Sequence, residues 1–235
     1  MLSFIVPAHN EAALIGDTLD ALRSAAEALR FRFEIIVVDD ASSDATGQIA
    51  SSAGARVLRV EHRHIAATRN AGAAAASGGH LVFVDADTQV DVPVLNAALS
   101  ALQAGAVGGG AAVRLLGELS WHERWGESFF VHLFRIIRIA PGCFVFCTRA
   151  AFDATGGFDM RYYAGEDVAF SRALARQGRF VILREAVRTS ARKLRTFTAL
   201  EHLKLALHFA WRGRGLLRSR DALDLWYGER RRERP

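Results

Sequence analysis

The sequence predicts an α/β protein with a mostly parallel central sheet and helices on both of its faces. Short, continuously apolar segments alternate with longer Ala- and Leu-rich segments over residues 2–84. Continuous apolar runs are typical of strands buried on both faces, and the alternation favours strand–helix–strand units. The chain has 235 residues, of which 51% are hydrophobic, which is enough for one sizeable core. We therefore expect one domain over residues 1–235.

Each element is justified by its local pattern. Four apolar runs predict strands at 2–7 (LSFIVP), 33–38 (FEIIVV), 55–60 (ARVLRV) and 80–84 (HLVFV). Helical spacing, alanine content or a capping residue predicts helices at 11–30, 43–52 and 64–77.

The second half has fewer clear elements. Gly108-Gly109-Gly110 lies between apolar segments and indicates a bulge or a close backbone approach in a later strand. A helix is expected over DVAFSRALARQG, which begins at Asp167 and ends at Gly178, and a last strand follows it. Residues 118–139 and 196–215 carry apolar stripes at helical spacing, which fit core packing or a membrane-facing role.

The positive charge is concentrated at the C-terminal end. Residues 188–235 hold thirteen Lys and Arg against five Asp and Glu, although the whole chain has a net charge of only +5. No aromatic–basic repeat or zinc-finger spacing accompanies them, so we expect no nucleic-acid partner. An anionic membrane surface or a phosphate-bearing substrate fits this charge, and so does a solvated basic tail.

Cysteine spacing and targeting signals point to an intracellular protein. Cys143 and Cys147 match neither a redox nor a zinc pattern, so we interpret them as reduced core residues. The N-terminus lacks a signal-peptide pattern, and no uncharged apolar run reaches about 18 residues. We expect the protein in the cytoplasm or at the inner face of the membrane, with peripheral membrane association as an open alternative.

Acidic residues follow three of the expected parallel strands. The strand ends read Pro7-Ala8-His9-Asn10-Glu11, Asp39-Asp40 and Asp85-Ala86-Asp87. Ligands bind at the carboxyl ends of the strands in such sheets, so these groups are expected to converge on one rim. Taken singly, each is ordinary turn or helix-capping chemistry, and Asp44 is expected to cap the second helix.

The rim carries no phosphate-binding glycine loop. Neither G-x-G-x-x-G after the first strand nor G-x-x-x-x-G-K-[ST] anywhere is present. A phosphate-containing ligand would therefore need a cation. The pair Asp85 and Asp87 offers carboxylate oxygens to Mg²⁺ or Mn²⁺, which would relieve their mutual repulsion.

Five segments together resemble the motifs of family 2 glycosyltransferases, inverting enzymes of the GT-A fold. They are FIVPAHNE, EIIVVDDASSDAT, TRNAGAAAASGGHLVFVDADT, GGFD and GEDVAFSRALARQG, in order over about residues 2–185. The resemblance implies a Rossmann-like sandwich that uses a nucleoside-diphosphate sugar. It also implies a nucleotide-sugar half (1–115), an acceptor and catalytic half (116–195), and a C-terminal amphipathic helix with a basic tail (196–235).

The resemblance further implies a role for each motif residue. The donor-binding residues would be Pro7, His9, Glu11, Asp39, Asp40, Arg69, Asp85, Ala86 and Asp87, with Asp87 and Asp85 also holding the metal. The acceptor side would be formed by Gly156, Gly157, Phe158 and Asp159. Arg192 and Lys193 follow the last strand, and we interpret them as phosphate contacts, with a solvated linker as the alternative. Arg69 has its own alternative, which is to cap a helix or to pair with Glu61.

Asp167, beside Glu166, would be the catalytic base. The neighbouring carboxylate and partial burial would raise the pKa of Asp167 toward working pH. The other interpretation is that both acids stabilise a helix N-terminus, and the two roles are compatible.

The motifs also limit the reaction. The Q-x-x-R-W signature and transmembrane helices of the family's processive synthases are missing. The sequence therefore predicts transfer of one sugar to an acceptor hydroxyl on a small molecule, a glycan or a lipid. The alternative is a non-catalytic scaffold of the same fold that binds a membrane surface or a partner through the basic C-terminus.

Overall fold

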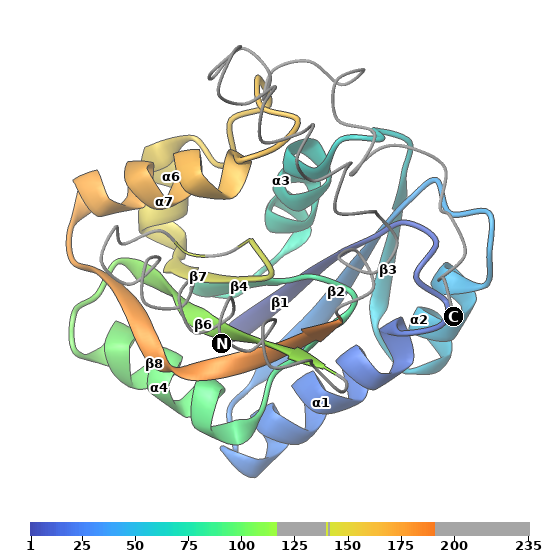
Figure 1. Cartoon of the computed structure of the whole chain (residues 1–235), viewed down its shortest axis with the longest axis horizontal. Helices are drawn as coiled ribbons and strands as arrows, with labels where there is room; N and C mark the ends of the chain where they lie inside the picture. Colours follow the sequence, from blue (N-terminus) through green and yellow to red (C-terminus); the bar gives the residue numbers. More distant parts are fainter. Residues whose placement is uncertain (117–139, 141, 191–235) are drawn as a thin grey trace, which may run out of the picture.

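The computed structural model describes residues 1–116, 140 and 142–190, which are coloured along the chain in Figure 1. They form a sheet of eight strands in the order β3-β2-β1-β4-β7-β6-β8-β5. The strands are β1 (Leu2–Ala8), β2 (Phe33–Asp40), β3 (Arg56–Val60), β4 (His80–Val84), β5 (Thr88–Gln89), β6 (Gly108–Leu116), β7 (Phe144–Thr148) and β8 (Phe180–Ser190). The helices are α1 (Ile15–Ala28), α2 (Thr46–Ser52), α3 (Ile65–Ala75), α4 (Val92–Gln103), α6 (Arg149–Thr155) and α7 (Glu166–Gln177).

The predicted mostly parallel sheet is confirmed. Strands β3, β2, β1 and β4 are mutually parallel neighbours. Strand β7 runs antiparallel to both β4 and β6, and β8 is parallel to β6. Two reversals return β6 and β8 to the direction of β4. The carboxyl ends of β1, β2, β4, β6 and β8 therefore lie at the same edge of the sheet.

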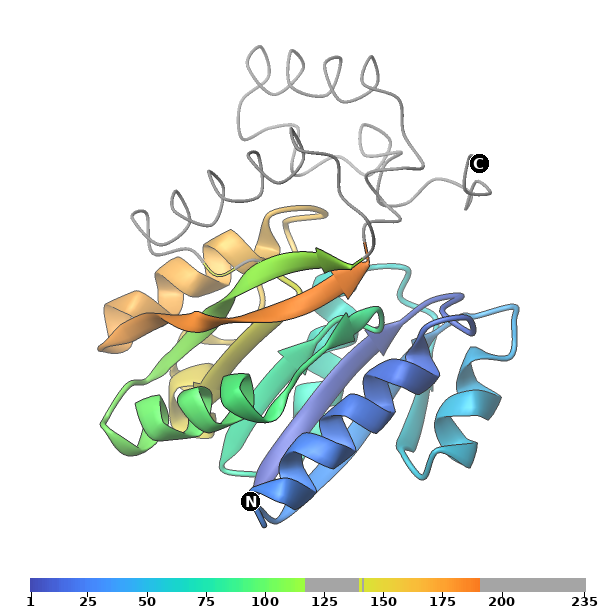
Figure 2. The same ribbon diagram turned by 60° about the horizontal axis from the view of Figure 1, so that its bottom comes forward.

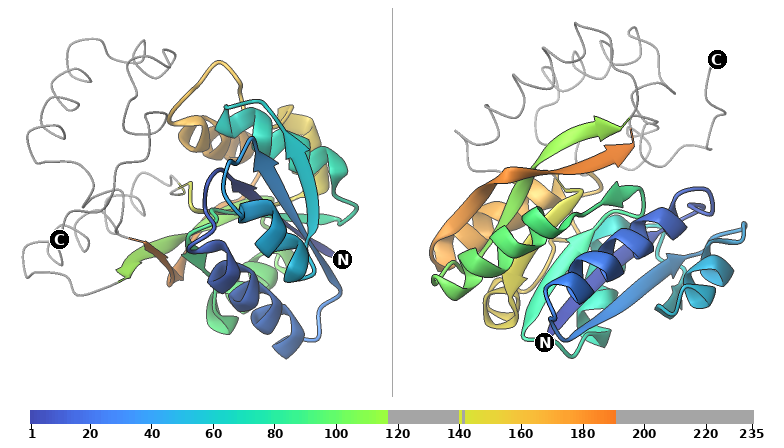
Figure 3. Two further views of the ribbon diagram at one scale, coloured as in Figure 1. Left: turned by 90° about the vertical axis from the view of Figure 1, so that its right-hand side faces the viewer. Right: turned by 90° about the horizontal axis from the view of Figure 1, so that it is seen from below.

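Helices cover both faces, as the apolar strand pattern predicts. Figure 1 shows α1 and α4 below the sheet and α3, α6 and α7 above it, and α1 and α4 lie in front of the strands when seen from below (Figure 3). Strand side chains alternate between the two layers: Phe4 and Val6 pack with α1, whereas Ile5 packs with α3. No helix of the described ranges is long and apolar enough to cross a membrane.

The helices begin later than the sequence suggests. α1 starts at Ile15 because the chain first turns after β1: Asn10 has a φ of 53°, and the Leu14 and Ile15 amides both donate to the Glu11 carbonyl at 3.0 Å. α2 starts at Thr46, whose amide donates to the Asp44 carboxylate at 3.0 Å. Asp44 thus holds the first turn as expected of a cap, although the N-cap position itself is occupied by Ala45.

The Gly108-Gly109-Gly110 run is both a close approach and a bulge. A Cβ on Gly109 would lie 2.2 Å from the Val181 carbonyl oxygen of β8 and 2.6 Å from the Phe146 ring of β7. The β6–β8 register shifts between Gly110 and Ala112. Only glycine leaves room for the Val181 carbonyl on one side and the Phe146 ring on the other, which explains the run.

Replacing Gly109 by alanine is expected to lower the free energy of unfolding by about 2 kcal/mol or more, because the contact on one side is a rigid carbonyl. Urea denaturation measures this change. Gly79→Ala is the matched control, since a Cβ there meets no atom within 4 Å. Equal effects of the two substitutions would contradict this explanation of the run.

Candidate active site

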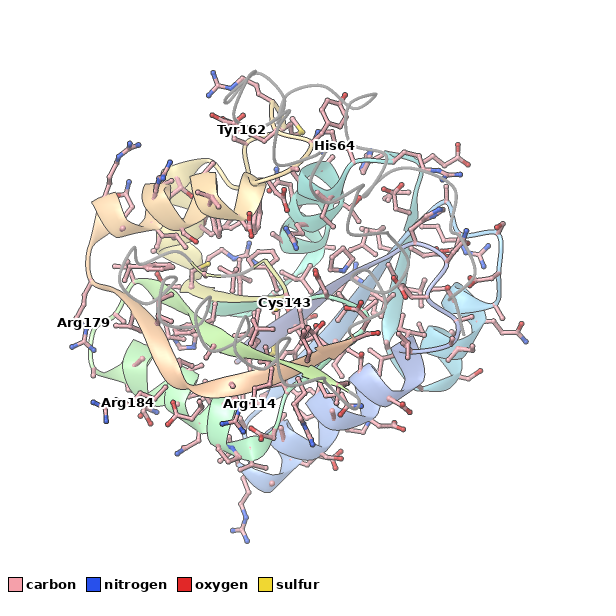
Figure 4. The ribbon with its side chains drawn as sticks, in the orientation of Figure 1. His64, Arg114, Cys143, Tyr162, Arg179 and Arg184 are labelled. Carbon is pink, nitrogen blue, oxygen red and sulfur yellow. The ribbon has the colours of Figure 1, made fainter. Side chains whose placement is uncertain are left out.

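The acidic strand ends meet at one edge of the sheet, as expected for parallel neighbours. Strand β1 lies between β2 and β4, so the turn after Ala8 sits between Asp39-Asp40 and Asp85. The backbone amide of Asp85 donates to the Cys143 carbonyl at 3.1 Å, which brings the start of β7 to the same place. Figure 4 shows Cys143 near the middle of the molecule, above β6 and β8.

Arg69 on α3 is a buried bridge between two of the predicted functional carboxylates. Its side chain donates to Glu166 Oε1 at 2.5 Å and to Asp85 Oδ1 at 2.9 Å. A third bond, of 2.9 Å, goes to the Gly142 carbonyl, and the Phe158 ring centroid lies 5.2 Å from the guanidinium carbon. One cation therefore connects the turn after β4 with the start of α7.

The alternative role of Arg69, pairing with Glu61, is wrong. The guanidinium is 2% exposed and points into the site instead of toward the surface loop that carries Glu61. Of the three side-chain nitrogens of Arg69, only Nε lacks a hydrogen-bond partner among the described residues. The two terminal nitrogens already donate hydrogen bonds to protein groups. We therefore propose that Arg69 positions other residues of the site and does not contact the sugar donor directly.

Asp167 and Glu166 occupy the first turn of α7, after Gly165 with a φ of 73°. The Asp167 carboxylate accepts the Val168 amide at 2.8 Å, and a Cβ on Gly142 would lie 2.9 Å from Asp167 Oδ2. Burial, followed by the negative charge of Glu166, raises the pKa of Asp167 to about 7, against the lowering effect of Arg69. The carboxyl is thus balanced to take up and release a proton near neutral pH.

Asp85 and Asp87 flank the same turn but differ in their surroundings. The Asp85 side chain is held by Arg69, whereas the Asp87 carboxylate, in a residue 7% exposed, lies 3.4 Å from the Thr189 hydroxyl of β8. The described residues contain no cluster of three potential ligands that would form a closed metal cage. Mg²⁺ and Mn²⁺ that act on phosphates usually take one or two carboxylates and leave other positions to water and substrate. The two carboxylates of Asp85 and Asp87 fit such an ion.

Asp39 and Asp40 point to opposite faces of β2 and have different partners. Both oxygens of Asp40 are engaged: the Arg63 amide donates at 2.8 Å, the Thr68 hydroxyl at 2.8 Å and the His64 amide at 3.2 Å. Asp40 thus fixes the loop before α3. Asp39 accepts the Ser42 amide at 3.2 Å and is 5% exposed. We therefore propose Asp39 for the nucleotide and a positioning role for Asp40.

The turn after β1 carries the other predicted donor residues. His9 is held from both sides, by the Asp40 carbonyl at 2.8 Å from Nδ1 and by Arg63 at 2.9 Å from Nε2. Glu11 is buried, and its amide donates to the Thr46 hydroxyl at 2.7 Å. The two backbone positions among the predictions lie nearby, Pro7 within β1 and Ala86 in the turn after β4.

The GGFD segment is held by a residue that sequence reasoning passed over. The Asn70 side chain pairs with both backbone groups of Phe158, accepting its amide at 2.9 Å and donating to its carbonyl at 2.8 Å. Gly156 and Gly157 have φ values of 75° and 80°, which glycine adopts freely. Asp159 forms an ion pair with Arg161 at 2.7 Å. Asn70 follows Arg69 directly, so the quoted TRNAG motif already contained the signal.

Two further predictions concern the cysteines and the basic segment. Cys143 and Cys147 are both free, and burial raises the pKa of each thiol; Cys147 lies in the core as expected, whereas Cys143 is only half-buried at its edge. Arg192, Lys193 and the stripes at 118–139 and 196–215 lie outside the described residues.

The sequence of this chain matches a known protein family. The sequence model of the family described as "Glycosyl transferase family 2" matches residues 3–161. The chain belongs to glycosyl transferase family 2. The resemblance inferred from the motifs is thereby confirmed. A curated relative, validoxylamine A glucosyltransferase from Streptomyces hygroscopicus subsp. jinggangensis, is 37% identical over 92 residues, which are 36% of this chain and 21% of that enzyme.

Solved structures of glycosyltransferases share the fold. TarS 1–349 from S. aureus aligns with a TM-score of 0.66 at 19% identity, over 96% of this chain and 77% of the other. The mannosyltransferase PcManGT from Pyrobaculum calidifontis aligns with a TM-score of 0.69 at 21% identity, over 92% and 60%. The chain thus spans about a fifth of the curated relative and about three fifths of PcManGT, so their whole activities do not transfer to it.

Proposed function

We propose that this protein is a metal-dependent, inverting glycosyltransferase that moves one sugar from a nucleoside-diphosphate sugar to an acceptor hydroxyl. The observation that carries the proposal is the Arg69 bridge, which ties Asp85 after β4 to Glu166 beside Asp167. It brings the carboxylates expected for the donor and for the base into one site. We assign residues 1–115 mainly to the donor and the later part to the acceptor.

Asp167 is the proposed general base. Its carboxylate removes the proton from the acceptor hydroxyl, whose oxygen forms a bond to the anomeric carbon while the bond from that carbon to the diphosphate breaks. One displacement inverts the anomeric centre. A pKa of about 7 leaves Asp167 ionised often enough at neutral pH to act, while its affinity for the proton remains high.

The donor end is assigned to Asp39, Glu11 and Asp87. Asp39 is proposed to accept hydrogen bonds from the base or ribose, and Glu11 and His9 shape the turn beside it. Asp87, with Asp85 next to it, would hold the Mg²⁺ or Mn²⁺ ion. When bound, this ion stabilises the negative charge that develops on the departing diphosphate.

The identity of donor and acceptor is proposed only by class. Structures of relatives contain UDP-GlcNAc in TarS, GDP-Man with Mn²⁺ in PcManGT, and UDP-Glc with Mn²⁺ in glucosyl-3-phosphoglycerate synthase from Mycobacterium tuberculosis. These support a uridine or guanosine diphosphate sugar. A small, glycan or lipid-linked acceptor is proposed, with the protein acting in the cytoplasm or at the inner membrane face.

Asp87→Ala is expected to abolish the metal-dependent part of nucleotide binding, because the other proposed ligand, Asp85, is already held by Arg69 at 2.9 Å. A thermal-shift panel of UDP, GDP, dTDP and CDP, with and without Mn²⁺, measures this. One diphosphate should raise the wild-type melting temperature by several degrees with Mn²⁺ and much less without it.

The control is Asp20→Ala, which removes an exposed carboxylate of α1 and should bind like wild type. If no diphosphate stabilises the wild type with Mn²⁺, or if Asp87→Ala responds equally, the proposed donor site is wrong.

A further inference from the structure

A row of basic and polar side chains crosses the strands next to the turn that carries Asp87. Arg114 of β6 and Arg188 of β8 are register partners in a parallel ladder, and Arg188 is paired in turn with Gln89 of β5. Register partners point to the same face of a sheet, about 4.8 Å apart at the backbone. Figure 2 shows the ends of β6 and β8 side by side.

Among the described residues, no ion pair gives this row a structural role. Val113 and Val187, one residue earlier on each strand, pack in the core with α1 and α4, so the arginines point to the opposite face. Both are exposed, and the ion pairs among the described residues involve Arg59, Arg69 and Arg161 instead. Two like charges side by side on neighbouring strands repel each other. Such a pair becomes favourable when an anion lies across it.

The row is also tied to the proposed metal position. Thr189, next to Arg188, donates its hydroxyl toward Asp87 Oδ1 at 3.4 Å, and the Ser190 amide donates to the Asp87 carbonyl at 3.2 Å. Gln89 follows Asp87 by two residues on β5. By alternation along β8, Thr189 and Arg188 point to opposite faces, so the arginines are tied to Asp87 through the backbone pairing of β8 with β5, which places them within a few residues of it along the strands.

Strand order separates this row from the nucleotide. The donor residues lie at the ends of β2, β1 and β4, whereas β6, β8 and β5 lie on the other side of β4 in the sheet. With the nucleotide lying along the ends of β2, β1 and β4, as proposed above, the sugar end of the donor would face the β6–β8 side, and an acceptor would enter from there.

We propose that Arg114 and Arg188 form a binding site for a phosphate-type anion carried by the acceptor. Two guanidinium groups present several N–H donors, which match phosphate oxygens and hold them at short distance. The inference rests on the proposed transferase function and narrows its acceptor to a phosphorylated one. The phosphate can belong to a soluble metabolite or to a lipid carrier, and the same two side chains would bind either.

The test measures binding with the diphosphate site already filled by the stabilising nucleotide and Mn²⁺. The probes are sn-glycerol 3-phosphate, titrated by calorimetry, and phosphatidylcholine vesicles with and without a polyprenyl monophosphate, followed by sedimentation. Arg114→Ala and Arg188→Ala should each weaken binding at least five-fold for whichever of the two probes the wild-type protein binds. Affinity of both variants for the nucleotide should stay within two-fold of wild type, which keeps this test separate from that of the donor site.

Arg179→Ala is the matched control, because it removes an exposed arginine just before the start of β8. Figure 4 shows Arg179 at the far left, well separated from Arg114. Binding of the soluble probe supports a metabolite, and binding of the polyprenyl vesicles alone supports a lipid carrier. The proposal is overturned if neither probe binds wild type, if the Arg179 variant loses as much affinity, or if the two arginine variants lose nucleotide binding instead.

Discussion

Arg69→Met is expected to destabilise the protein by about 3–5 kcal/mol and to reduce turnover by about 100-fold or more. The substitution leaves Glu166, which is 6% exposed, and Asp85 without their shared cation. Removing one partner of a buried ion pair costs this much because the other charge stays buried. The loss of turnover follows because the turn after β4 and the start of α7 are no longer held together.

Arg69→Lys separates charge from geometry. Lysine keeps the positive charge but cannot reach Glu166, Asp85 and the Gly142 carbonyl together, because it lacks the planar fork of arginine. We expect it to recover part of the stability and less of the turnover. Urea denaturation and donor turnover, with the sugar released to water or acceptor, measure the two effects.

Arg149 provides the control for these substitutions. Its guanidinium donates to the Ala73 and Ala76 carbonyls at 2.8 Å each, at the far end of α3. Arg149→Met should lower stability through lost hydrogen bonds while turnover per folded molecule stays near the wild-type value. An Arg69→Met variant that is unstable but fully active would show that the bridge only supports the fold.

Local patterns were sufficient for most of the sheet. Strand β4 was predicted with its observed bounds, because its apolar run ends sharply at Asp85 and begins after two glycines. The antiparallel β7 was not recognised, since FVFCT is as continuously apolar as the parallel strands and its direction depends on pairing with β4 and β6. Direction is a property of partners, which a single strand does not reveal.

Helix α4 was missed although its signals are present. Asp91 caps it by accepting the Val94 amide at 3.0 Å, Pro93 lies in its first turn, and apolar positions recur to Leu102. The contacts within the site, in contrast, have no local signal in the sequence. The bridge joins Arg69 to Glu166, a residue 97 positions later, and no local pattern encodes that contact.

The motifs therefore predicted which residues form the site, whereas the separate role proposed for each residue depends on the structure. Asp39 and Asp40 look equivalent in the sequence. Alternation along β2 points them to opposite faces of the sheet. On its face, the Asp40 carboxylate accepts hydrogen bonds from the Arg63 and His64 amides and from the Thr68 hydroxyl. A pair of acids thus separates into a proposed ligand contact and a loop anchor.

Asp167→Asn is expected to abolish turnover and, at the same time, to stabilise the folded protein above neutral pH. In the wild type, turnover should rise with pH through a midpoint of about 7, because the base acts only when ionised. Initial rates between pH 5 and 9 measure this limb. The asparagine variant should show no turnover at any pH, whereas Asp153→Asn, an exposed change on α6, should keep the wild-type profile.

The effect on stability has the opposite sign because burial raises the pKa of Asp167 from 3.8 to about 7. Between these two values the folded state binds the proton more tightly than the unfolded state, so the stability contributed by this group falls as pH rises. Above about pH 7 the folded protein bears the cost of an ionised, half-buried carboxylate beside Glu166, which asparagine removes. Melting temperatures should therefore be similar at pH 4.5 and several degrees higher for Asp167→Asn at pH 8. If the variant is inactive but no more stable than wild type at pH 8, the carboxyl is not held in the strained ionised form that makes it a base.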